Sequence, residues 1–369
     1  MKTLEPNLNA ASPVQSLLSG HWFKLICGAS YQDLPAVRNL ALAYALAGAD
    51  CIDVAADLAV VSAAKAGLVV AEKLARSPDS RWQRSRYVRP LLMVSMSAGE
   101  DPHFRKAWFD PAVCPADCER PCEGVCPAAA IAFTPPQSGV INERCYGCGR
   151  CLPICPYGLI EARSHPTSLD AIAQQVLSQA DALEIHTQVG QQHAFAHIWQ
   201  TIQPWISHLQ LISISCPDGE DLIAYLQALQ QIMHADTNTS KPVLVWQTDG
   251  RPMSGDIGRG TTHAAIRLAQ KVLAADLWGH VQLAGGTNQH TVTKLHELSL
   301  LPSGPNAVPV AHSTVSGIAY GSFARGLLMS VLEQTHYLEE APCSLQTAVT
   351  LAESLVVPLK QAAIGQHKT

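Results

Sequence analysis

Eight cysteines crowded into one short stretch constrain this chain more than any other feature. They are Cys114, Cys118, Cys122, Cys126, Cys145, Cys148, Cys151 and Cys155, and they lie within 42 positions. With 369 residues the chain can form a large hydrophobic core, and its first residues lack the basic and then apolar pattern of a secretory signal. Disulfide staples are therefore not expected, and cysteines at this density predict metal ligation.

The second half of the stretch has the spacing C-x₂-C-x₂-C-x₃-C and is followed by Pro156. This is the bacterial ferredoxin run, in which three closely spaced thiolates bind one face of a four-iron cluster. Gly147 and Gly149 let backbone amides approach the inorganic sulphides. A zinc site would use four ligands, usually in two separated C-x₂-C pairs. The pattern therefore predicts a 4Fe–4S cluster.

The first half of the stretch is a second copy of this run. The hexapeptides that begin at Cys126 and Cys155 align as an internal repeat, but the first two gaps of the earlier copy hold three residues instead of two. We expect a second 4Fe–4S cluster there, with a 3Fe–4S or labile cluster as the alternative. In two-cluster proteins the fourth cysteine of a run binds the other cluster. Crossed ligation would group Cys126 with Cys145, Cys148 and Cys151, and Cys155 with Cys114, Cys118 and Cys122.

Outside the cysteines, short apolar runs alternate with helical patterns. The runs cover residues 22–27, 51–54, 90–96, 182–186, 209–214, 243–247, 280–284 and 307–311, the last continuing towards 318–320. Such alternation predicts parallel strands joined by crossover helices, and eight units predict a closed (β/α)₈ TIM-like barrel. An open doubly wound sheet is the alternative, although no G-x-G-x-x-G follows the first run.

The cysteines interrupt this alternation after the third run. We expect residues 1–99 to form the first part of the barrel, 100–164 an inserted two-cluster ferredoxin-like α+β domain, 165–340 the second part of the barrel and 341–369 a C-terminal helical tail. An insertion after strand three would rise from the C-terminal face, where barrel sites are built. The remaining cysteines are expected to be small buried core residues, and these are Cys27, Cys51, Cys216 and Cys343.

Composition excludes several other classes of protein. Hydrophobic residues make up 47% of the chain and charged residues 15%, which excludes a disordered polypeptide. A net charge of −5 provides no general attraction to nucleic acid or anionic membranes, and no apolar run reaches the roughly 18 residues that span a bilayer. We therefore expect a soluble, cytoplasmic protein without a nucleic-acid partner.

Glycine-rich turns after three predicted strands are candidate ligand sites. The turn after the sixth run opens a helix, where exposed amides and two arginines favour an anion. Shorter turns follow the seventh and eighth runs, at the usual position of phosphate sites in barrels. A phosphate ligand such as FMN is therefore weighed against purely structural turns. The candidate cofactor-binding residues are Arg251, Gly255, Gly258, Arg259, Gly260, Gly285, Gly286, Gly321 and Ser322.

The 15 histidines are scattered along the chain. His193 and His197 share a helix face but lack the intervening glutamate of a zinc protease, so we expect a surface helix there. His186 and His312 lie at the ends of predicted strands, where a pocket is within reach, although a structural role is favoured. No nucleophile–base pair is evident, and no catalytic residue is assigned.

The cysteine motifs together with their flanks resemble the cyanobacterial light-dependent period family. The resemblance covers nearly the whole chain, from HWFKLICG at residues 21–28, through the cysteines, to GIAYGSFAR at residues 317–325. The ferredoxin motif alone is widespread, so the flanks make the resemblance specific. It implies a protein that carries iron–sulphur clusters and feeds the cellular redox state into the circadian clock, through contact with clock-input kinases or clock components.

Two functions from different classes remain open at this point. One is a redox sensor, in which the clusters change state and the barrel passes that change to protein partners. The other is a flavin-dependent oxidoreductase, in which the clusters supply electrons to a flavin on a barrel similar to that of dihydroorotate dehydrogenases. The family resemblance favours the sensor over the enzyme. A visible spectrum of iron–sulphur alone would support the sensor, and bound flavin would support the enzyme.

Overall fold

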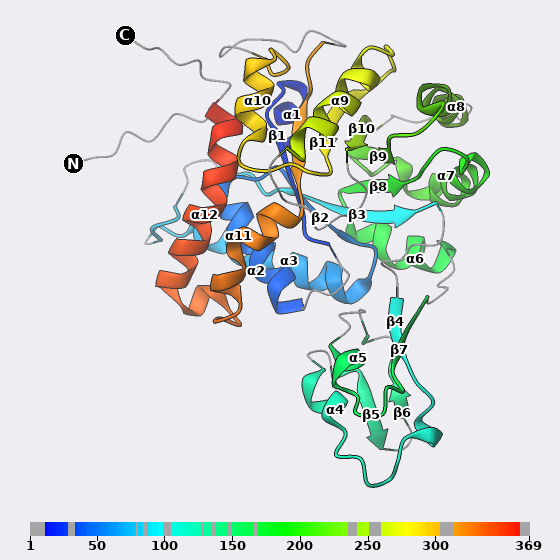
Figure 1. Ribbon diagram of the computed structural model, residues 1–369. Helices are drawn as coiled ribbons and strands as arrows, with labels where there is room; N and C mark the ends of the chain where they lie inside the picture. The colour runs from blue at the N-terminus through cyan, green and yellow to red at the C-terminus, as the bar shows by residue number, and fades with distance from the viewer. Residues whose placement is uncertain are drawn as a thin grey trace.

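The eight predicted strand units form one closed parallel barrel, so the predicted TIM-like fold is confirmed (Figure 1). The computed structural model describes residues 12–28, 34–78, 80–83, 87–98, 105–126, 129–134, 137–142, 144–145, 150–164, 169–234, 242–250, 260–302 and 313–361. Each barrel strand pairs with the barrel strands that come before and after it in the chain, and the first pairs with the last to close the barrel. The strands are β1 (Trp22–Ile26), β2 (Cys51–Ala55), β3 (Leu91–Ser97), β8 (Ala182–His186), β9 (Leu211–Pro217), β10 (Val243–Asp249), β11 (His280–Ala284) and β12 (Gly317–Tyr320).

Helices cover the outside of the barrel (Figure 1). They are α2 (Leu34–Ala47), α3 (Leu58–Arg76), α6 (Leu169–Val176), α7 (Gln192–Ile206), α8 (Leu222–His234), α9 (Thr262–Leu273), α10 (Thr291–Glu297), α11 (Ser322–Leu332) and α12 (Pro342–Gln361), with α1 (Pro13–Leu18) before the first strand. Single 3₁₀ turns occupy η1 (Pro111–Val113), η2 (Leu177–Gln179) and η3 (Leu338–Glu340). None of the described helices is both long enough and apolar enough to cross a lipid bilayer.

The helix α3 illustrates how the local sequence sets these elements. Asp57 caps its N-terminus, because its Oδ1 accepts hydrogen bonds from the backbone N–H groups of Ala59 at 2.9 Å and Val60 at 3.3 Å. Basic residues in its last turn interact favourably with the negative, C-terminal end of the helix dipole. A side chain at Gly67 would lie 2.2 Å from the carbonyl oxygen of Arg38, so glycine is what allows α2 and α3 to pack closely.

The interior of the barrel changes character from its amino end to its carboxyl end. The amino half is apolar, and its side chains pack against Leu17 of α1, which closes that end; they are Trp22, Cys51, Leu91, Met93, Ala182, Leu211 and Val245. The carboxyl half contains buried charged and polar side chains instead, among them Lys24, Asp53 and Glu184. Barrel interiors are usually filled by branched apolar residues throughout, so the polar half is a departure.

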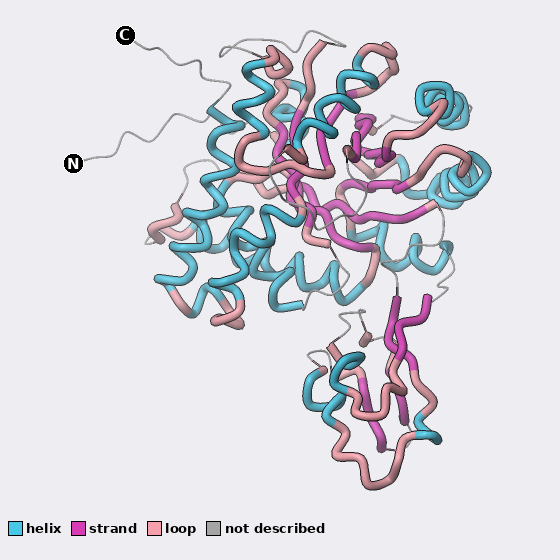
Figure 2. The backbone as a smooth tube through the Cα atoms, in the orientation of Figure 1, coloured by secondary structure: helices cyan, strands magenta, loops and turns pink. Residues whose placement is uncertain are grey.

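The chain leaves the barrel after β3, at the C-terminal ends of the strands, and returns to it at β8. Two antiparallel strands, β4 (Arg105–Trp108) and β7 (Glu161–Ser164), lie between the barrel and the rest of the insertion (Figure 1). Beyond them are a second strand pair, β5 (Ile131–Thr134) and β6 (Gln137–Val140), and two short helices, α4 (Pro121–Val125) and α5 (Cys151–Ile154). Loops make up much of this part (Figure 2).

The sequence predictions differ from the structure in two details. Cys27, Cys51 and Cys216 are buried as predicted, but Cys343 is exposed, because it occupies the first turn of α12 on the side that faces away from the core. The fifth strand runs from residue 211 to residue 217 rather than from 209 to 214. Of the eighth predicted run, residues 307–311 lie outside the described part of the chain, and the strand itself is β12.

Candidate functional site

The cysteine-rich insertion is built as two similar halves. In one half α4 ends directly before Cys126 and β5 follows; in the other, α5 ends directly before Cys155 and β7 follows. The two helices pack against each other. Ile131 and Ile160, which occupy equivalent places in the repeat, are both buried in the small core of the insertion. The internal repeat seen in the sequence is therefore also a repeat in structure.

Backbone amides point at the sulphur atoms in both halves. The N–H of Ala130 donates to Cys126 Sγ at 3.2 Å, and the N–H of Leu159 donates to Cys155 Sγ at 3.4 Å, four residues after the cysteine in each case. A third such bond runs from Arg120 N to Cys118 Sγ at 3.4 Å. Hydrogen bonds of this kind stabilise the negative charge on cluster ligands and tune cluster potentials. The donor geometry fits thiolates that bind iron.

Four of the cysteines that the expected crossed ligation would group influence one another's ionisation. Burial raises the pKa of Cys114, and so do Cys118, with which it forms a hydrogen bond, and Cys155. Burial likewise raises the pKa of Cys122, with further contributions from Cys155 and Cys114. Thiols that repel one another's ionisation in this way lie close together, and a bound cation would remove the repulsion. Cys155 therefore lies near enough to the earlier run to influence the ionisation of Cys114 and Cys122.

Cys155 is the thiol best prepared to ionise. Burial opposes ionisation, but the backbone N–H groups of Leu159, Tyr157, Ile160 and Gly158 outweigh it and hold the pKa of Cys155 below its ordinary value. Thiolate is the form that binds a metal. The turn that follows Cys155 therefore favours the form of this residue that could bind a metal.

The other proposed ligand set is described only in part. Cys145 and Cys151 are buried in the core of the insertion, with Cys126 packed against them. Cys148, Gly147 and Gly149 lie outside the described residues. Within the described ranges, no three His, Cys, Asp or Glu side chains converge closely enough to hold a single metal ion. Ligands of a cluster stand farther apart than ligands of one ion, because each binds a different iron atom.

One lysine connects the insertion to the barrel. Lys106 of β4 donates a hydrogen bond to the carbonyl oxygen of Asn142 at 2.5 Å, and its Nζ lies 3.7 Å from Oδ2 of Asp57. The side chains of Lys106 and Asp57 are 13% and 16% exposed, so the ion pair is largely shielded from solvent. Because Asp57 caps α3 and Asn142 lies three residues before Cys145, this contact joins the segment that leads to Cys145 to a barrel helix.

The glycine-rich turns remain predicted ligand sites. Arg251, Gly255, Gly258 and Arg259 lie outside the described residues. Gly260 is described and has a φ of +87° with open space where a side chain would be. The four other candidates, Gly285, Gly286, Gly321 and Ser322, lie at the C-terminal ends of β11 and β12, as predicted.

These described turns have contacts within the chain as well. The carbonyl oxygen of Gly286 accepts hydrogen bonds from the hydroxyl groups of Thr261 at 2.9 Å and Thr262 at 3.2 Å. The Ser322 hydroxyl accepts one from Arg325 at 3.2 Å. Of the histidines, His193 and His197 are exposed on α7 as predicted, and His312 lies outside the described residues.

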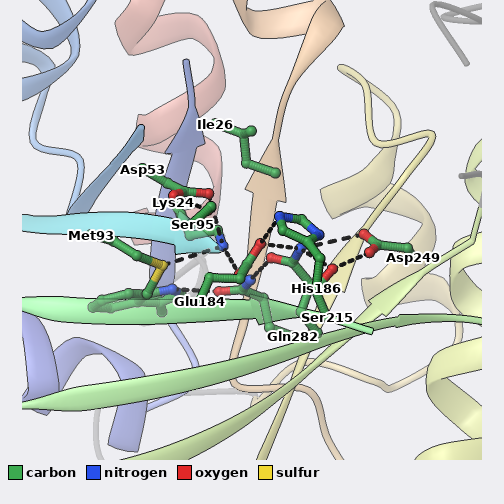
Figure 3. A network of polar contacts seen from close by, with 12 residues as sticks. Lys24, Ile26, Asp53, Met93, Ser95, Glu184, His186, Ser215, Asp249 and Gln282 are labelled. Carbon is green, nitrogen blue, oxygen red and sulfur yellow. Dashed lines mark hydrogen bonds and ion pairs between the residues drawn. The ribbon is translucent and has the colours of Figure 1, made fainter. Parts of the chain in front are cut away.

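His186 belongs to a buried polar network that the sequence analysis did not find (Figure 3). Its Nε2 lies 3.3 Å from Oε1 of Glu184. Glu184 also accepts a hydrogen bond from Lys24 and one from Gln247 at 2.9 Å. Lys24 Nζ lies 3.4 Å from Oδ2 of Asp53. A polar residue inside an otherwise apolar run, such as Lys24 in WFKLI and Glu184 in ALEIH, was the available signal.

The charged members of the network determine each other's ionisation. Burial alone would lower the pKa of Lys24, but Glu184 and Asp53 together raise it. Burial would raise the pKa of Glu184, but Lys24 holds it below its usual value. The pKa of Asp53 is raised to about 6, because burial outweighs the attraction of Lys24. Lys24 is therefore a fixed cation between two carboxyl groups.

Comparison with known protein families covers both parts of the chain. The model for the light dependent period A C-terminal domain matches residues 175–358, and the model for the iron–sulphur cluster-binding domain of the same family matches residues 114–166. Light dependent period A from Synechococcus elongatus is 54% identical over 367 residues, which are 98% of this chain and 97% of that protein.

Other similarities are partial. The electron transport protein HydN of Escherichia coli K12 is 41% identical over 54 residues, which are 15% of this chain and 31% of that protein. Among solved structures, a tryptophan synthase chain of Mycobacterium tuberculosis covers 96% of this chain and 98% of its own, with a TM-score of 0.42 and 11% sequence identity. That structural overlap is too loose to carry any argument about this chain.

Proposed function

The chain belongs to the light dependent period A family, and from this premise we propose that it is a redox sensor with two iron–sulphur clusters. In this proposal it passes the redox state of the cell to the circadian clock through protein partners. The partners are those implied by the family, namely components of clock input. The site of action would be the cytoplasm.

The observation that carries the proposal is the grouping of Cys114, Cys118, Cys122 and Cys155. Three of these residues come from the earlier run and one from the later run, which matches the crossed ligation of two-cluster ferredoxins. Backbone N–H groups around Cys155 favour its thiolate form. The remaining cysteines, Cys126, Cys145, Cys148 and Cys151, would hold the second cluster.

Bound clusters of this type exchange single electrons, at potentials that span roughly −700 to +450 mV. The chain's own contribution is to fix the thiolates and to shape the charge around them. Each N–H···S bond stabilises added negative charge and so favours the reduced state. The added charge of a reduced cluster would therefore first affect groups that contact the loops carrying these cysteines.

The proposed route from the insertion to the barrel runs through Lys106. An added negative charge near Cys145 attracts the Lys106 ammonium group and weakens its hold on Asp57. Asp57 then alters its cap on α3, the helix that begins at the C-terminal end of β2.

The experiment is an anaerobic purification followed by iron and sulphide analysis and electron paramagnetic resonance after dithionite reduction. We expect about eight iron atoms per chain for two 4Fe–4S clusters. Cys155→Ser should lose one cluster signal. Cys343→Ser, which changes an exposed cysteine on α12, is the matched control and should lose none. Full iron content in Cys155→Ser would contradict the ligand set, and a flavin spectrum would favour the oxidoreductase instead.

A further inference from the structure

Arg120 lies inside the earlier cysteine run, in the gap between Cys118 and Cys122. That gap holds three residues where the ferredoxin pattern has two. Arg120 has a left-handed backbone, with φ of 54° and ψ of 50°, directly before Pro121 at the start of α4. Residues other than glycine seldom adopt this conformation, and a following proline favours extended backbone instead. The surroundings of Arg120 therefore hold it in an unusual turn.

The Arg120 side chain is held against the core of the insertion. Its guanidinium carbon lies 4.2 Å from the centroid of the Phe133 ring, and Phe133 packs against the core residues. The backbone N–H of Arg120 donates to Cys118 Sγ at 3.4 Å. Its positive charge favours the thiolate form of Cys114, which burial and two neighbouring cysteines oppose. Arg120 is therefore a cation that acts on cysteines of one proposed ligand set.

No carboxylate among the described residues compensates the charge of Arg120. Its Nε is buried and has no hydrogen-bond partner within the described ranges. Four other arginines each face a carboxylate, and these are Arg38, Arg76, Arg89 and Arg163. A buried N–H donor without an acceptor costs free energy, the more so when it belongs to a charged group. An anionic group beside Arg120 would remove this cost, and a cluster bound by thiolates is such a group.

The corresponding arginine of the other half is arranged differently. Arg150 directly precedes α5 as Arg120 directly precedes α4, so the two occupy equivalent places in the structural repeat. Arg150 has ordinary helical angles, with φ of −59° and ψ of −29°, and it is exposed. Its run has the regular gap of two residues before Cys151. The half with the longer gap is therefore the one that holds its arginine against the core.

We propose that Arg120 raises the reduction potential of the cluster to which Cys155 belongs, and that the longer cysteine gap serves to place this charge. A four-iron cluster with four thiolate ligands carries net negative charge, which increases when one electron is added, and net charge is one determinant of its potential. A fixed positive charge nearby stabilises the more negative, reduced state. The inference rests on the ligand set of the proposed function, and it names the residue that determines how readily this cluster is reduced.

The test is a redox titration of the iron-loaded full chain, followed by electron paramagnetic resonance. The signal that is lost in Cys155→Ser identifies the cluster in question. Arg120→Met keeps an unbranched side chain against Phe133 but removes the charge. It should make one-electron reduction of this cluster about tenfold less favourable, a shift of about 59 mV to lower potential. Arg150→Met removes the equivalent but exposed charge and should change the same equilibrium less than about threefold.

Two further variants keep the test decisive if Arg120→Met loses the cluster. Arg120→Lys keeps the positive charge and should keep the potential close to that of the wild type. Phe133→Leu keeps the charge but removes the ring under the guanidinium group, and it should lower the potential by a smaller amount than Arg120→Met.

The proposal is overturned if Arg120→Met or Phe133→Leu retains the cluster at the wild-type potential. Equal shifts in Arg120→Met and Arg150→Met would also overturn it, because they would indicate a general effect of net charge, and so would a potential in Arg120→Lys as low as that in Arg120→Met. If wild-type protein lacks the signal that depends on Cys155, the ligand set itself is wrong and this inference is rejected with it. A signal that is present but unmoved rejects the role of Arg120 alone.

Discussion

The barrel and the insertion place cysteine in opposite surroundings. In the barrel, burial raises the pKa of Cys51 and raises that of Cys216 to about 12, so these thiols stay protonated among apolar side chains. In the insertion, burial also opposes ionisation of Cys155, but the backbone N–H groups after it lower its pKa. The difference shows that the backbone around a cysteine, and not only its burial, determines how readily the thiol ionises.

The two regions also differ in what stabilises them. The barrel has an extensive apolar core between its strands and its helices. Among the described residues of the insertion, eight form a buried core, and three of them are cysteines: Ala107, Phe109, Cys122, Ala130, Ile131, Cys145, Cys151 and Ile160. So small a core provides little stability, whereas metal binding contributes folding free energy directly. The insertion should therefore need its iron to fold, and the barrel should not.

Removing the iron should produce the largest effect. Anaerobic chelation should abolish hydrogen-exchange protection across residues 105–164, because the remaining apolar core is too small to hold the insertion together. Protection in β1, β2 and β9 should remain. Iron-loaded protein carried through the same procedure without chelator is the control. An insertion that keeps its protection without iron would remove the contrast between the two regions.

A change at the centre of the barrel should produce the next largest effect. Lys24→Met leaves Glu184 and Asp53 without their cation, and breaking such a buried pair should cost about 3–5 kcal/mol in the free energy of unfolding. Lys271→Met breaks an exposed ion pair with Asp218 and should cost under about 1 kcal/mol. Urea unfolding followed by tryptophan fluorescence measures both. The cluster spectrum should be unchanged in each variant.

The Lys24 prediction would be contradicted if the two lysine variants lost equal stability. It would also be contradicted if Lys24→Met removed the clusters while the barrel kept its stability. The first result would mean that the buried pair stabilises the barrel no more than an exposed pair does, and the second that the network supports the insertion and not the barrel.

A pH effect specific to the barrel should be the smallest. Because the folded pKa of Asp53 is about 6 and the ordinary value is 3.8, the folded state binds more protons than the unfolded state between these values. This group therefore contributes stability that increases as the pH falls, by about 1 kcal/mol between pH 7 and pH 5. Asp53→Asn should remove that increase. An identical pH profile in wild type and Asp53→Asn, measured by urea unfolding, would contradict it.

Most of the fold could be predicted because its signals are local. Runs such as Ala182–His186 and His280–Ala284 are apolar, short and followed by helices, and both are strands with the predicted bounds. The candidate ligand cysteines could also be recognised in the sequence, because the ferredoxin spacing is fixed by the geometry of a cluster. The exposed Cys343 was predicted wrongly, because a single cysteine in a helix carries no periodic signal of its own.

The functional contacts between distant segments could not be predicted. Lys24 and Glu184 are 160 positions apart, and only barrel closure brings them together. In the sequence, Lys106 is only a basic residue in a short strand, and Asp57 is an ordinary helix cap. The ion pair between Lys106 and Asp57 depends on the position of the insertion relative to the barrel, which neither sequence pattern specifies.

Hydrogen exchange in oxidised and dithionite-reduced protein tests the central claim most directly, namely that the barrel detects the state of the clusters through Lys106 and Asp57. Reduction should change protection in β4 and in residues 57–61 at the start of α3. Lys106→Met should abolish the change in α3 but not the changes inside the insertion. Lys65→Met, which alters a lysine of α3 that donates a hydrogen bond to Gln179 instead, should behave as wild type. Changes confined to the insertion, or a change in α3 that persists in Lys106→Met, would contradict the account.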